Sequence, residues 1–268
     1  MPRRARLDAE LVRRGLARSR EQAAGLVTAG RVTVAGRPTA KPATSVAPGE
    51  PIAVREDDAV PAYASRGGHK LARALDVFAP EGLEVAGRRC LDAGASTGGF
   101  TDVLLRHGAE HVVAVDVGYG QLAWSLRTDP RVTTLDRTNA RVLTAEVLGG
   151  PVGLVVADLS FISLTVVLPA LVACTADGAD LLLMVKPQFE VGRDRVGRGG
   201  VVRDPGLRAD AVRTVSRAAA DLGLGTRGVT ASPLPGPSGN VEYFLWLRVG
   251  PSIVDEDAVR RAVAEGPA

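Results

Sequence analysis

The sequence predicts an α/β protein in which a Rossmann-like domain with a parallel sheet follows a small α+β unit. Three observations lead to this prediction. Beyond about residue 66, apolar runs typical of buried strands alternate with segments of helical periodicity. Residues 1–55 contain only short helix and strand patterns. These residues also hold 11 Lys and Arg against 4 Asp and Glu, a net charge of +7, whereas the rest of the chain sums to −4.

The composition is that of a globular protein with a substantial core. Of the 268 residues, 46% are hydrophobic and 24% are charged, which is ordinary for one large domain or for a small domain joined to a larger one. Cys90 and Cys174 stand in apolar surroundings, so we expect reduced core cysteines, and the spacing of Cys and His predicts no metal site. The basic N-terminus lacks the apolar stretch of a secretory signal. We therefore expect a cytoplasmic protein.

The N-terminal unit is predicted to combine two helices with a small sheet. Residues 6–15 form a short amphipathic helix, and a second helix over 19–30 has Ser19 as its N-cap. Residues 31–40 alternate around an Ala-Gly turn as a hairpin does, and 50–54 add a further strand. The concentrated positive charge favours nucleic acid as a partner over a merely solvated face.

The pattern "RLDAELVRRGLARSREQAAGLVTAGRVTVAG" resembles the ribosomal-protein-S4-like RNA-binding domain over residues 6–54. In that family, two helices beside a small sheet present basic side chains to structured RNA. The resemblance implies an S4-like domain over residues 1–55 and a set of candidate RNA contacts: Arg4, Arg6, Arg18, Arg20 and Lys41. Residues 56–65, which are charged and then rich in Pro and Ala, are predicted to be a linker.

The domain over residues 66–268 is predicted from the order of its segments. A helix over 65–78 comes first, and a strand ending at Asp92 leads into a Gly-rich turn. The remaining segments mostly alternate between helix and strand. They are helix 100–108, strand 110–116, helix 121–127, strand 131–135, strand 153–158, helix 163–174, strand 180–186, helix 204–223 and strands 226–233 and 241–249. Strands alternating with helices indicate βαβ units and a parallel sheet covered on both faces.

Four of these strands end in a polar residue: Asp92, Asp116, Asp158 and Lys186. Ligands of such sheets bind outside the carboxyl ends of the strands, so we expect these side chains to line one crevice. Lys186 is notable because 30 of the 33 basic residues are Arg, and the other lysines are Lys41 and Lys70. Arg does not lose its proton in a protein, whereas a desolvated Lys can, so a lysine at this point suggests that an amine is needed.

The Gly-rich turn "DAGASTGGF" differs from the G-x-G-x-x-G of dinucleotide-binding folds. Its pattern, an acidic residue followed by spaced glycines, resembles the first motif of S-adenosylmethionine-dependent methyltransferases. A tight turn without any ligand is the alternative. The resemblance implies S-adenosyl-L-methionine as cofactor and the following contacts: Asp92, Gly94, Ala95, Ser96, Thr97, Gly98, Gly99, Phe100 and Thr101 in the turn, Asp116 and Val117 at the ribose, Asn139 at the adenine, and Asp158, Phe161 and Ser163 after the fourth strand.

The order Lys70, Asp158, Lys186 and Glu242 resembles the catalytic tetrad of FtsJ-like ribose 2′-O-methyltransferases. Together with the S4-like domain, the segments "SRGGHKL", "LDAGASTGGFTD", "VADLSFISL", "VKPQFE" and "PSGNVEYF" resemble the TlyA (hemolysin A) family of ribosomal RNA 2′-O-methyltransferases over nearly the full length. The domain after the linker is therefore expected to be an FtsJ-like, class I methyltransferase domain.

This resemblance implies a metal-free transfer of a methyl group from S-adenosyl-L-methionine to a ribose 2′-hydroxyl. Lys186 is expected to act as the general base, as an amine that burial and the neighbouring Lys70 keep without a proton. Asp158 is expected to orient the lysines and the hydroxyl, and Glu242 to hold Lys70 or the ribose. The family implies cytidines in rRNA, presented on ribosomal subunits, as the substrate. Some members modify one subunit only; the basic N-terminus favours both 16S and 23S rRNA here.

Further RNA contacts are expected beside the crevice. The Gly-rich loop 191–204 carries four arginines, of which Arg193 and Arg195 are the candidates, and Arg66 lies where the linker meets the catalytic domain. A surface loop without RNA contacts is the alternative.

Three other functions are open to the sequence. A membrane-lytic protein, as the hemolysin name suggests, would need the apolar window 153–174 to insert, but Asp158 and Pro169 interrupt that window. An RNA-binding or ribosome-assembly factor with an idle catalytic domain is disfavoured because all four tetrad residues are present. A pseudouridine synthase would carry an Arg-Leu-Asp motif in its catalytic part, whereas the one such motif here begins at Arg6.

Overall fold

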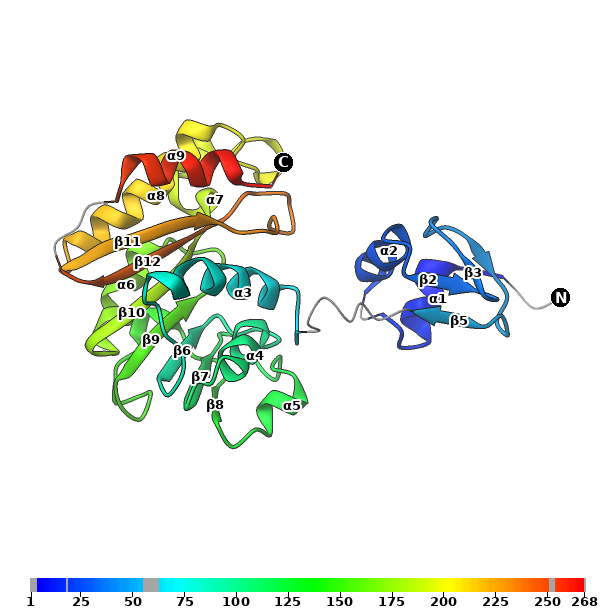
Figure 1. The fold of residues 1–268 in the computed structure, drawn as a ribbon, viewed down its shortest axis with the longest axis horizontal. Helices are drawn as coiled ribbons and strands as arrows, with labels where there is room; N and C mark the ends of the chain where they lie inside the picture. Colours follow the sequence, from blue (N-terminus) through cyan, green and yellow to red (C-terminus); the bar gives the residue numbers. More distant parts are fainter. Residues whose placement is uncertain (1–3, 18, 55–62, 251–253, 268) are drawn as a thin grey trace. The chain divides into compact units, whose positions relative to one another are not determined.

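The structure is a computed structural model that describes residues 4–17, 19–54, 63–250 and 254–267 of the chain. Its internal contacts divide the chain into two units, Met1–Ala62 and Tyr63–Ala268 (Figure 1). Most of the predicted linker, up to residue 62, lies outside the described residues. The last part of that segment packs on the second unit, where the backbone N–H of Ala64 donates to Asp102 at 2.8 Å.

The N-terminal unit has the predicted α+β architecture. Helices α1 (Leu7–Arg13) and α2 (Arg20–Thr28) enclose a small core to which the strands contribute Val32 and Val46. Strand β2 (Val32–Val34) lies between β3 (Arg37–Pro38) and β5 (Ile52–Val54), and β1 (Ala5–Arg6) pairs with β4 (Ser45–Val46).

Two local predictions in this unit are confirmed. The Ser19 hydroxyl accepts a hydrogen bond from the backbone N–H of Gln22 at 3.1 Å and so caps α2. The turn between β2 and β3 places Ala35 and Gly36 at φ values of 49° and 75°. Two consecutive left-handed residues form the tight turn that suits the twist of a hairpin.

The second unit is built on one seven-stranded sheet in the order β11-β12-β10-β9-β6-β7-β8. The strands, with their bounds, are β6 (Arg89–Ala93), β7 (His111–Val115), β8 (Val132–Leu135), β9 (Val152–Ala157), β10 (Thr175–Val185), β11 (Leu224–Ala231) and β12 (Tyr243–Val249). Neighbouring strands from β10 to β8 are parallel. This arrangement confirms the predicted α/β fold with its mostly parallel sheet.

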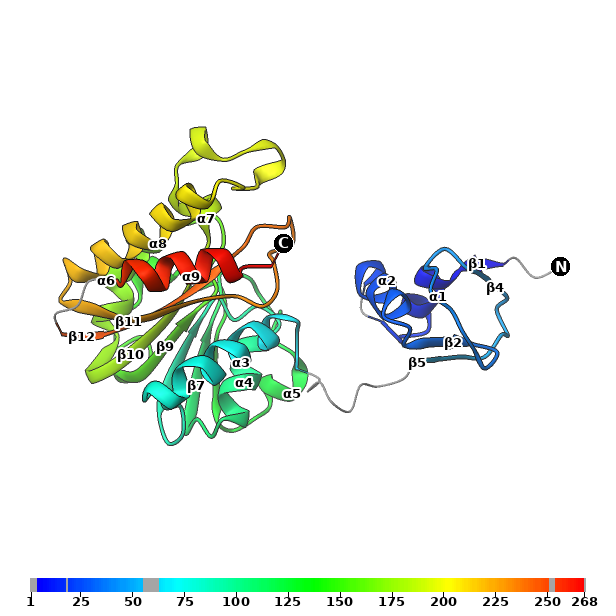
Figure 2. The same ribbon diagram turned by 45° about the horizontal axis from the view of Figure 1, so that its top comes forward.

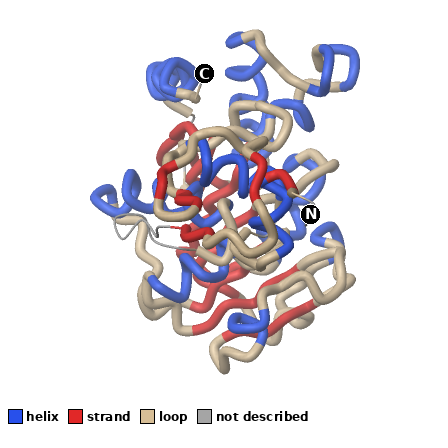
Figure 3. The backbone as a smooth tube through the Cα atoms, turned by 90° about the vertical axis from the view of Figure 1, so that its right-hand side faces the viewer, coloured by secondary structure: helices blue, strands red, loops and turns tan. Residues whose placement is uncertain are grey.

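Helices cover both faces of the sheet (Figure 2). One face packs on α3 (Gly67–Phe78), α4 (Gly99–Arg106) and α5 (Trp124–Arg127), and the other on α6 (Leu164–Ala173), α8 (Pro205–Ala220) and α9 (Glu256–Glu265). Along β10, Leu181 and Leu183 belong to the core with α6 and α8, whereas Leu182 and Met184 belong to the core with α3 and α4. Burial on both sides explains why these strands are continuously apolar. Figure 3 separates the strands by colour from the helices and loops.

The direction of β12 differs from the expected parallel sheet. Strand β12 runs antiparallel to both β10 and β11. A loop, residues 232–242, joins β11 to β12, and parallel neighbours need a longer crossover that usually contains a helix. The reversal places the beginning of β12, rather than its end, at the edge where β10 ends, because Val185 pairs with Tyr243.

Two other features complete this unit. The C-terminal helix α9, which the sequence reading omitted, is amphipathic and buries Val259 and Ala262. Within the described ranges, no helix combines the length and apolar character needed to cross a bilayer.

Candidate active site

The four predicted catalytic residues come from four elements that meet at one edge of the sheet. Asp158 directly follows β9 and Lys186 directly follows β10, while Glu242 directly precedes the antiparallel β12. Lys70 lies in the first turn of α3, which covers the same edge. All four line a cavity of about 320 Å³, together with the Gly-rich turn, Ser65, Arg66, Gly67, Ser160 and Pro237.

The two lysines are held by separate carboxylates. The Nζ of Lys70 lies 2.5 Å from Oε2 of Glu242, and the side chains are 6% and 1% exposed. The Nζ of Lys186 lies 2.6 Å from Oδ1 of Asp158, in a more open position where the aspartate side chain is 24% exposed. Two lysine–carboxylate pairs therefore converge on one cavity, one of them closed and the other partly open.

The amine of Lys186 has a second partner that the sequence reading did not identify. Its Nζ donates to the hydroxyl of Ser160 at 3.0 Å. Ser160 stands two residues after Asp158, so the segment that follows β9 supplies both groups that orient this amine. The sequence signal that could have identified Ser160 was its position close to Asp158.

The Gly-rich turn after β6 closely approaches the segment after β9. Gly94 has a φ of 89°, and a Cβ at this position would lie 2.6 Å from the backbone carbonyl oxygen of Asp158. Gly98 has a φ of 96°, and a Cβ there would overlap the side chains of Leu122 and Leu126. Both positions therefore require glycine, and the turn brings its backbone to the cavity as the resemblance implied.

A second cavity, of about 430 Å³, adjoins the first. Four residues line both: Gly94, Ser96, Asp158 and Ser160. The predicted cofactor contacts Asp116, Val117, Asn139 and Phe161 line the second cavity, as do Gln121 and Arg141, which the sequence reading missed. Both volumes fall in the range of pockets that hold small organic ligands.

The polar residues of the second cavity are fixed by backbone groups. The carboxylate of Asp116 accepts hydrogen bonds from the N–H of Ser96 at 2.8 Å and of Gly118 at 2.7 Å. Asn139 accepts one from the N–H of Arg141 at 3.0 Å. Phe161 has a left-handed backbone and is 93% exposed, so it is not a core residue. Its ring contacts that of Phe189.

Four of the expected cofactor contacts line neither cavity: Asp92, Gly98, Thr101 and Ser163. Asp92 is completely buried beneath the turn, where the hydroxyl of Thr101 donates to its Oδ2 at 2.7 Å. Burial raises the pKa of Asp92 to about 7, although the hydrogen bond from Thr101 opposes this shift. Ser163 caps α6 and donates to the half-buried carboxylate of Glu190.

Four of the predicted RNA contacts in the first unit lie among the described residues; all four are exposed, but not all are free. Arg6 and Arg20 both donate to the buried carboxylate of Asp8, and Arg4 contacts Ser45 and Glu50. Lys41 is exposed, whereas Arg18 lies outside the described residues.

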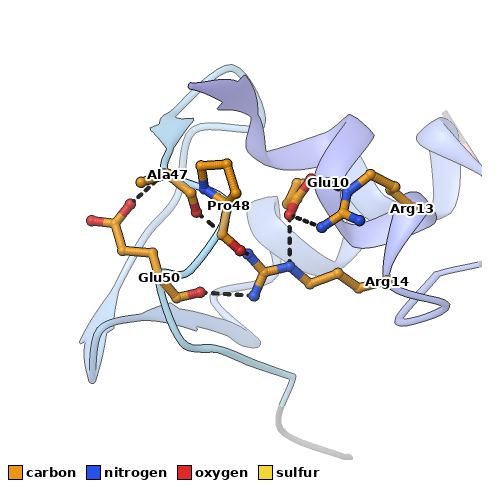
Figure 4. Close-up of polar contacts among 6 residues, drawn as sticks. All are labelled: Glu10, Arg13, Arg14, Ala47, Pro48 and Glu50. Carbon is orange, nitrogen blue, oxygen red and sulfur yellow. Dashed lines mark hydrogen bonds and ion pairs between the residues drawn. The ribbon is translucent and has the colours of Figure 1, made fainter. Parts of the chain in front are cut away.

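Other arginines of this unit stabilise its fold. Arg14 donates to Glu10 and to the carbonyl oxygens of Pro48 and Glu50 (Figure 4). A basic residue in this unit is therefore not necessarily an RNA contact.

The second unit contributes three further RNA candidates. Arg193 and Arg195 are exposed in the loop that follows α7 (Pro187–Glu190). Arg66 is exposed at the first cavity and donates to the carbonyl oxygen of Pro235 at 3.2 Å.

Comparison with known proteins agrees with this geometry. The sequence model of FtsJ-like methyltransferases matches residues 63–249, and that of the S4 domain matches residues 5–52. The chain is 64% identical, over 100% of both proteins, to the 16S/23S rRNA (cytidine-2′-O)-methyltransferase TlyA of Mycobacterium tuberculosis. It is 37% identical to hemolysin A of Brachyspira hyodysenteriae, with 89% of this chain and 98% of the relative covered.

A solved structure gives the same result. The structure of a protein named as a hemolysin, from Streptococcus thermophilus, has a TM-score of 0.77 and 37% identity, and the match covers 99% of this chain and 96% of that one. The chain therefore belongs to the TlyA family of methyltransferases, in which an S4 domain precedes an FtsJ-like catalytic domain.

Proposed function

We propose that this protein transfers a methyl group from S-adenosyl-L-methionine to the ribose 2′-hydroxyl of cytidines in 16S and 23S rRNA. The observation that carries the proposal is the convergence of Lys70, Lys186 and their two carboxylate partners on one cavity beside the Gly-rich turn. The 64% identity to a 16S/23S rRNA (cytidine-2′-O)-methyltransferase supports the choice of substrate. Ribosomal subunits in the cytoplasm are the proposed target.

The second cavity has the donor and acceptor groups that the cofactor requires. The Asp116 carboxylate would accept the ribose hydroxyls, Asn139 would meet the adenine edge, and the backbone of residues 94–99 would hold the methionine portion. Replacing Gly94 by any other residue would bring a side chain against Asp158, so this cradle exists only with glycine. S-adenosyl-L-methionine, when bound, supplies an electrophilic methyl group on a sulfonium ion.

The protein's own groups then prepare the ribose hydroxyl. Lys186 is the proposed general base, because its amine faces the cavity and is oriented by Asp158 and Ser160. Lys70, fixed by Glu242, would hold the ribose or its phosphate by donating hydrogen bonds. A buried pair keeps its geometry without substrate, so much of the rate would come from positioning.

The exposed basic residues of both units would bring the RNA to the protein. Arg4, Arg6, Arg20 and Lys41 of the first unit and Arg66, Arg193 and Arg195 of the second are the proposed contacts. Such contacts are made chiefly to phosphates, so they place the RNA without selecting a base.

The test is methyl transfer to ribosomal subunits from a strain that lacks the enzyme, measured for two variants at position 186. Lys186→Ala should abolish transfer, and Lys186→Arg should do so too, because it keeps the charge but not a base. Calorimetric titration with S-adenosyl-L-methionine should still show binding by both. Full activity of either variant would remove Lys186 from the mechanism, and absence of cofactor binding by the unaltered protein would refute the whole proposal.

A further inference from the structure

One loop of the catalytic unit combines exposed cations with a fixed backbone. We define the arginine loop as residues 191–204, between α7 and α8. Its arginines at 193, 195, 198 and 203 are all exposed. The loop is nevertheless ordered, since the N–H of Gly197 donates to the carbonyl oxygen of Val201 at 3.2 Å and closes its tip. The residues at the base of this loop therefore need contacts that hold them in place.

The base is held by the side chain of Asn240. Its Oδ1 accepts a hydrogen bond from the N–H of Val202 at 2.9 Å, and its Nδ2 donates to the carbonyl oxygen of Gly200 at 2.8 Å. Asn240 is only 2% exposed, and its bond to Val202 is buried while its bond to Gly200 is partly buried. An amide supplies the acceptor and the donor that this stretch of backbone needs, which no carboxylate or aliphatic side chain of similar size does. Arg208 adds one more bond, from its Nε to the carbonyl oxygen of Val202 at 2.9 Å.

Asn240 also belongs to the segment that surrounds Glu242. The N–H of Gly236 donates to the backbone carbonyl oxygen of Asn240 at 2.8 Å. A Cβ at Gly236 would lie 2.6 Å from Oε1 of Glu242, so this backbone packs directly on the catalytic carboxylate. One residue thus joins the arginine loop to the wall of the cavity that holds Lys70 and Glu242.

We infer that Asn240 is a positioning residue that fixes the arginine loop relative to the Lys70–Glu242 pair, so that RNA phosphates bound by the loop bring one ribose into the cavity. The inference rests on the proposed function, since it names the residue that aligns the substrate. Asn240 itself touches neither substrate nor cofactor in this role. It acts through the loop, and its removal should change RNA capture far more than the chemical step.

The first experiment needs no activity. Trypsin cleavage within the arginine loop is compared for the unaltered protein, Asn240→Ala and a control, Ser232→Ala. The Ser232 hydroxyl donates to the carbonyl oxygen of Leu234 and accepts from its N–H, both outside the arginine loop. Loss of the Asn240 bonds should accelerate cleavage by roughly tenfold or more, because local opening becomes easier. The control should be cut at the original rate. Equal cleavage of Asn240→Ala and the unaltered protein would overturn the inference.

The second experiment is a double-mutant cycle with the loop variant Arg193→Ser/Arg195→Ser. Asn240→Ala alone should raise the KM for ribosomal subunits by roughly tenfold and leave kcat within about twofold. In the Arg193→Ser/Arg195→Ser background, Asn240→Ala should raise the KM little further, because a loop without these two arginines has fewer phosphate contacts to position. Equal effects in both backgrounds would contradict the inference.

Two further measures keep the inference testable if the protein proves inactive or if the variant does not fold. If the protein bound rRNA but transferred no methyl group, the proposed function would fail, whereas the same cycle measured as Kd for rRNA would still test Asn240. If Asn240→Ala did not fold, Asn240→Asp would replace it, since aspartate has nearly the same volume and keeps the acceptor toward Val202 but puts an oxygen against the carbonyl of Gly200. That variant should show the same increase in cleavage.

Discussion

At the scale of single residues, the two lysine–carboxylate pairs are chemically alike but differ in exposure. Both lysines are buried, but Glu242 is 1% exposed whereas Asp158 is 24% exposed. A pair removed from water is fixed and costly to break, while a more open pair can exchange partners when a substrate enters. This difference suits Lys70 to holding and Lys186 to proton transfer.

The buried pair predicts a stability pattern that is independent of catalysis. Lys70→Met should destabilise the protein by about 3 kcal/mol, because Glu242 is left as an uncompensated buried charge, and Glu242→Leu should do the same to Lys70. The double variant should be more stable than either single variant. Urea unfolding of the four proteins measures this cycle, and simple additivity of the two losses would show that the pair is not coupled.

Asp92 predicts a stability that depends on pH. Burial raises its pKa to about 7, above the ordinary value of 3.8, so the folded state binds a proton that the unfolded state releases at lower pH. Stability from this group is present at low pH and falls as the pH rises through about 7. Between pH 5 and pH 8 the free energy of unfolding should therefore fall by roughly 3 kcal/mol.

The variant Asp92→Asn isolates this contribution, because an amide resembles the protonated carboxyl and does not titrate. Unfolding free energies at pH 5 and pH 8 are compared for both proteins. The unaltered protein should lose stability relative to Asp92→Asn on going to pH 8, and a constant difference between the two would mean that Asp92 is already charged at pH 5.

The residue scale also shows where sequence reasoning ends. Lys186 and Asp158 were found because each ends an apolar strand, and this position is readable from the sequence alone. Asp92 also ends an apolar run, yet its side chain points beneath the turn to Thr101. Ser160 carries no pattern of its own and becomes important only through its distance to the amine of Lys186. The pairing of Glu242 with Lys70, 172 residues apart, was expected from the family resemblance and not from any local pattern.

At the scale of elements, local signals predicted most of the helices, although α9 was missed. Asp204 with Pro205 begins α8 as expected, and its carboxylate accepts hydrogen bonds from the N–H groups of Gly206 and Leu207. The direction of β12 was not predictable from its composition, because a strand buried on both faces reads the same in either direction. That direction decides the site, since it brings Glu242 to the edge where β10 ends.

The strand–turn–helix element from β6 to α4 carries its own prediction. Gly94→Ala should abolish binding of S-adenosyl-L-methionine, because its Cβ would meet the carbonyl oxygen of Asp158 and its backbone would be strained at a φ of 89°. Calorimetric titration with the cofactor gives the affinity directly. Gly120→Ala is a matched control, since that glycine also has a positive φ but has no atom near its Cβ. Equally weakened cofactor binding by both variants would show that backbone strain, rather than the close approach at Gly94, causes the loss.

At the scale of the whole molecule, the chain joins two units with separate cores. Leu7, Leu11 and Val27 belong to the small core of the first unit, and two larger clusters lie on the two faces of the seven-stranded sheet. The charge follows the same division, with +7 in residues 1–55 and −4 in the rest. The uneven charge was thus a sequence signal for a cation-rich unit followed by a second unit of different character. A charge count, however, did not show that Arg14 is used inside the fold.

This division predicts the behaviour of a shortened chain, residues 56–268. It keeps the segment at Tyr63 and Ala64 that packs on α3 and α4, so its affinity for S-adenosyl-L-methionine should stay within about twofold of the full chain. Its affinity for rRNA should fall, and the slope of log Kd against log salt concentration should flatten by about 3, since each of the proposed contacts Arg4, Arg6, Arg20 and Lys41 would account for somewhat less than one released counterion. Filter binding at several salt concentrations measures the slope, and calorimetry measures the affinity for the cofactor.

An unchanged slope would place the decisive phosphate contacts in the catalytic unit, with the arginine loop as the first region to examine. A lost cofactor affinity would instead show that the first unit supports the cofactor site, although the two units have separate cores.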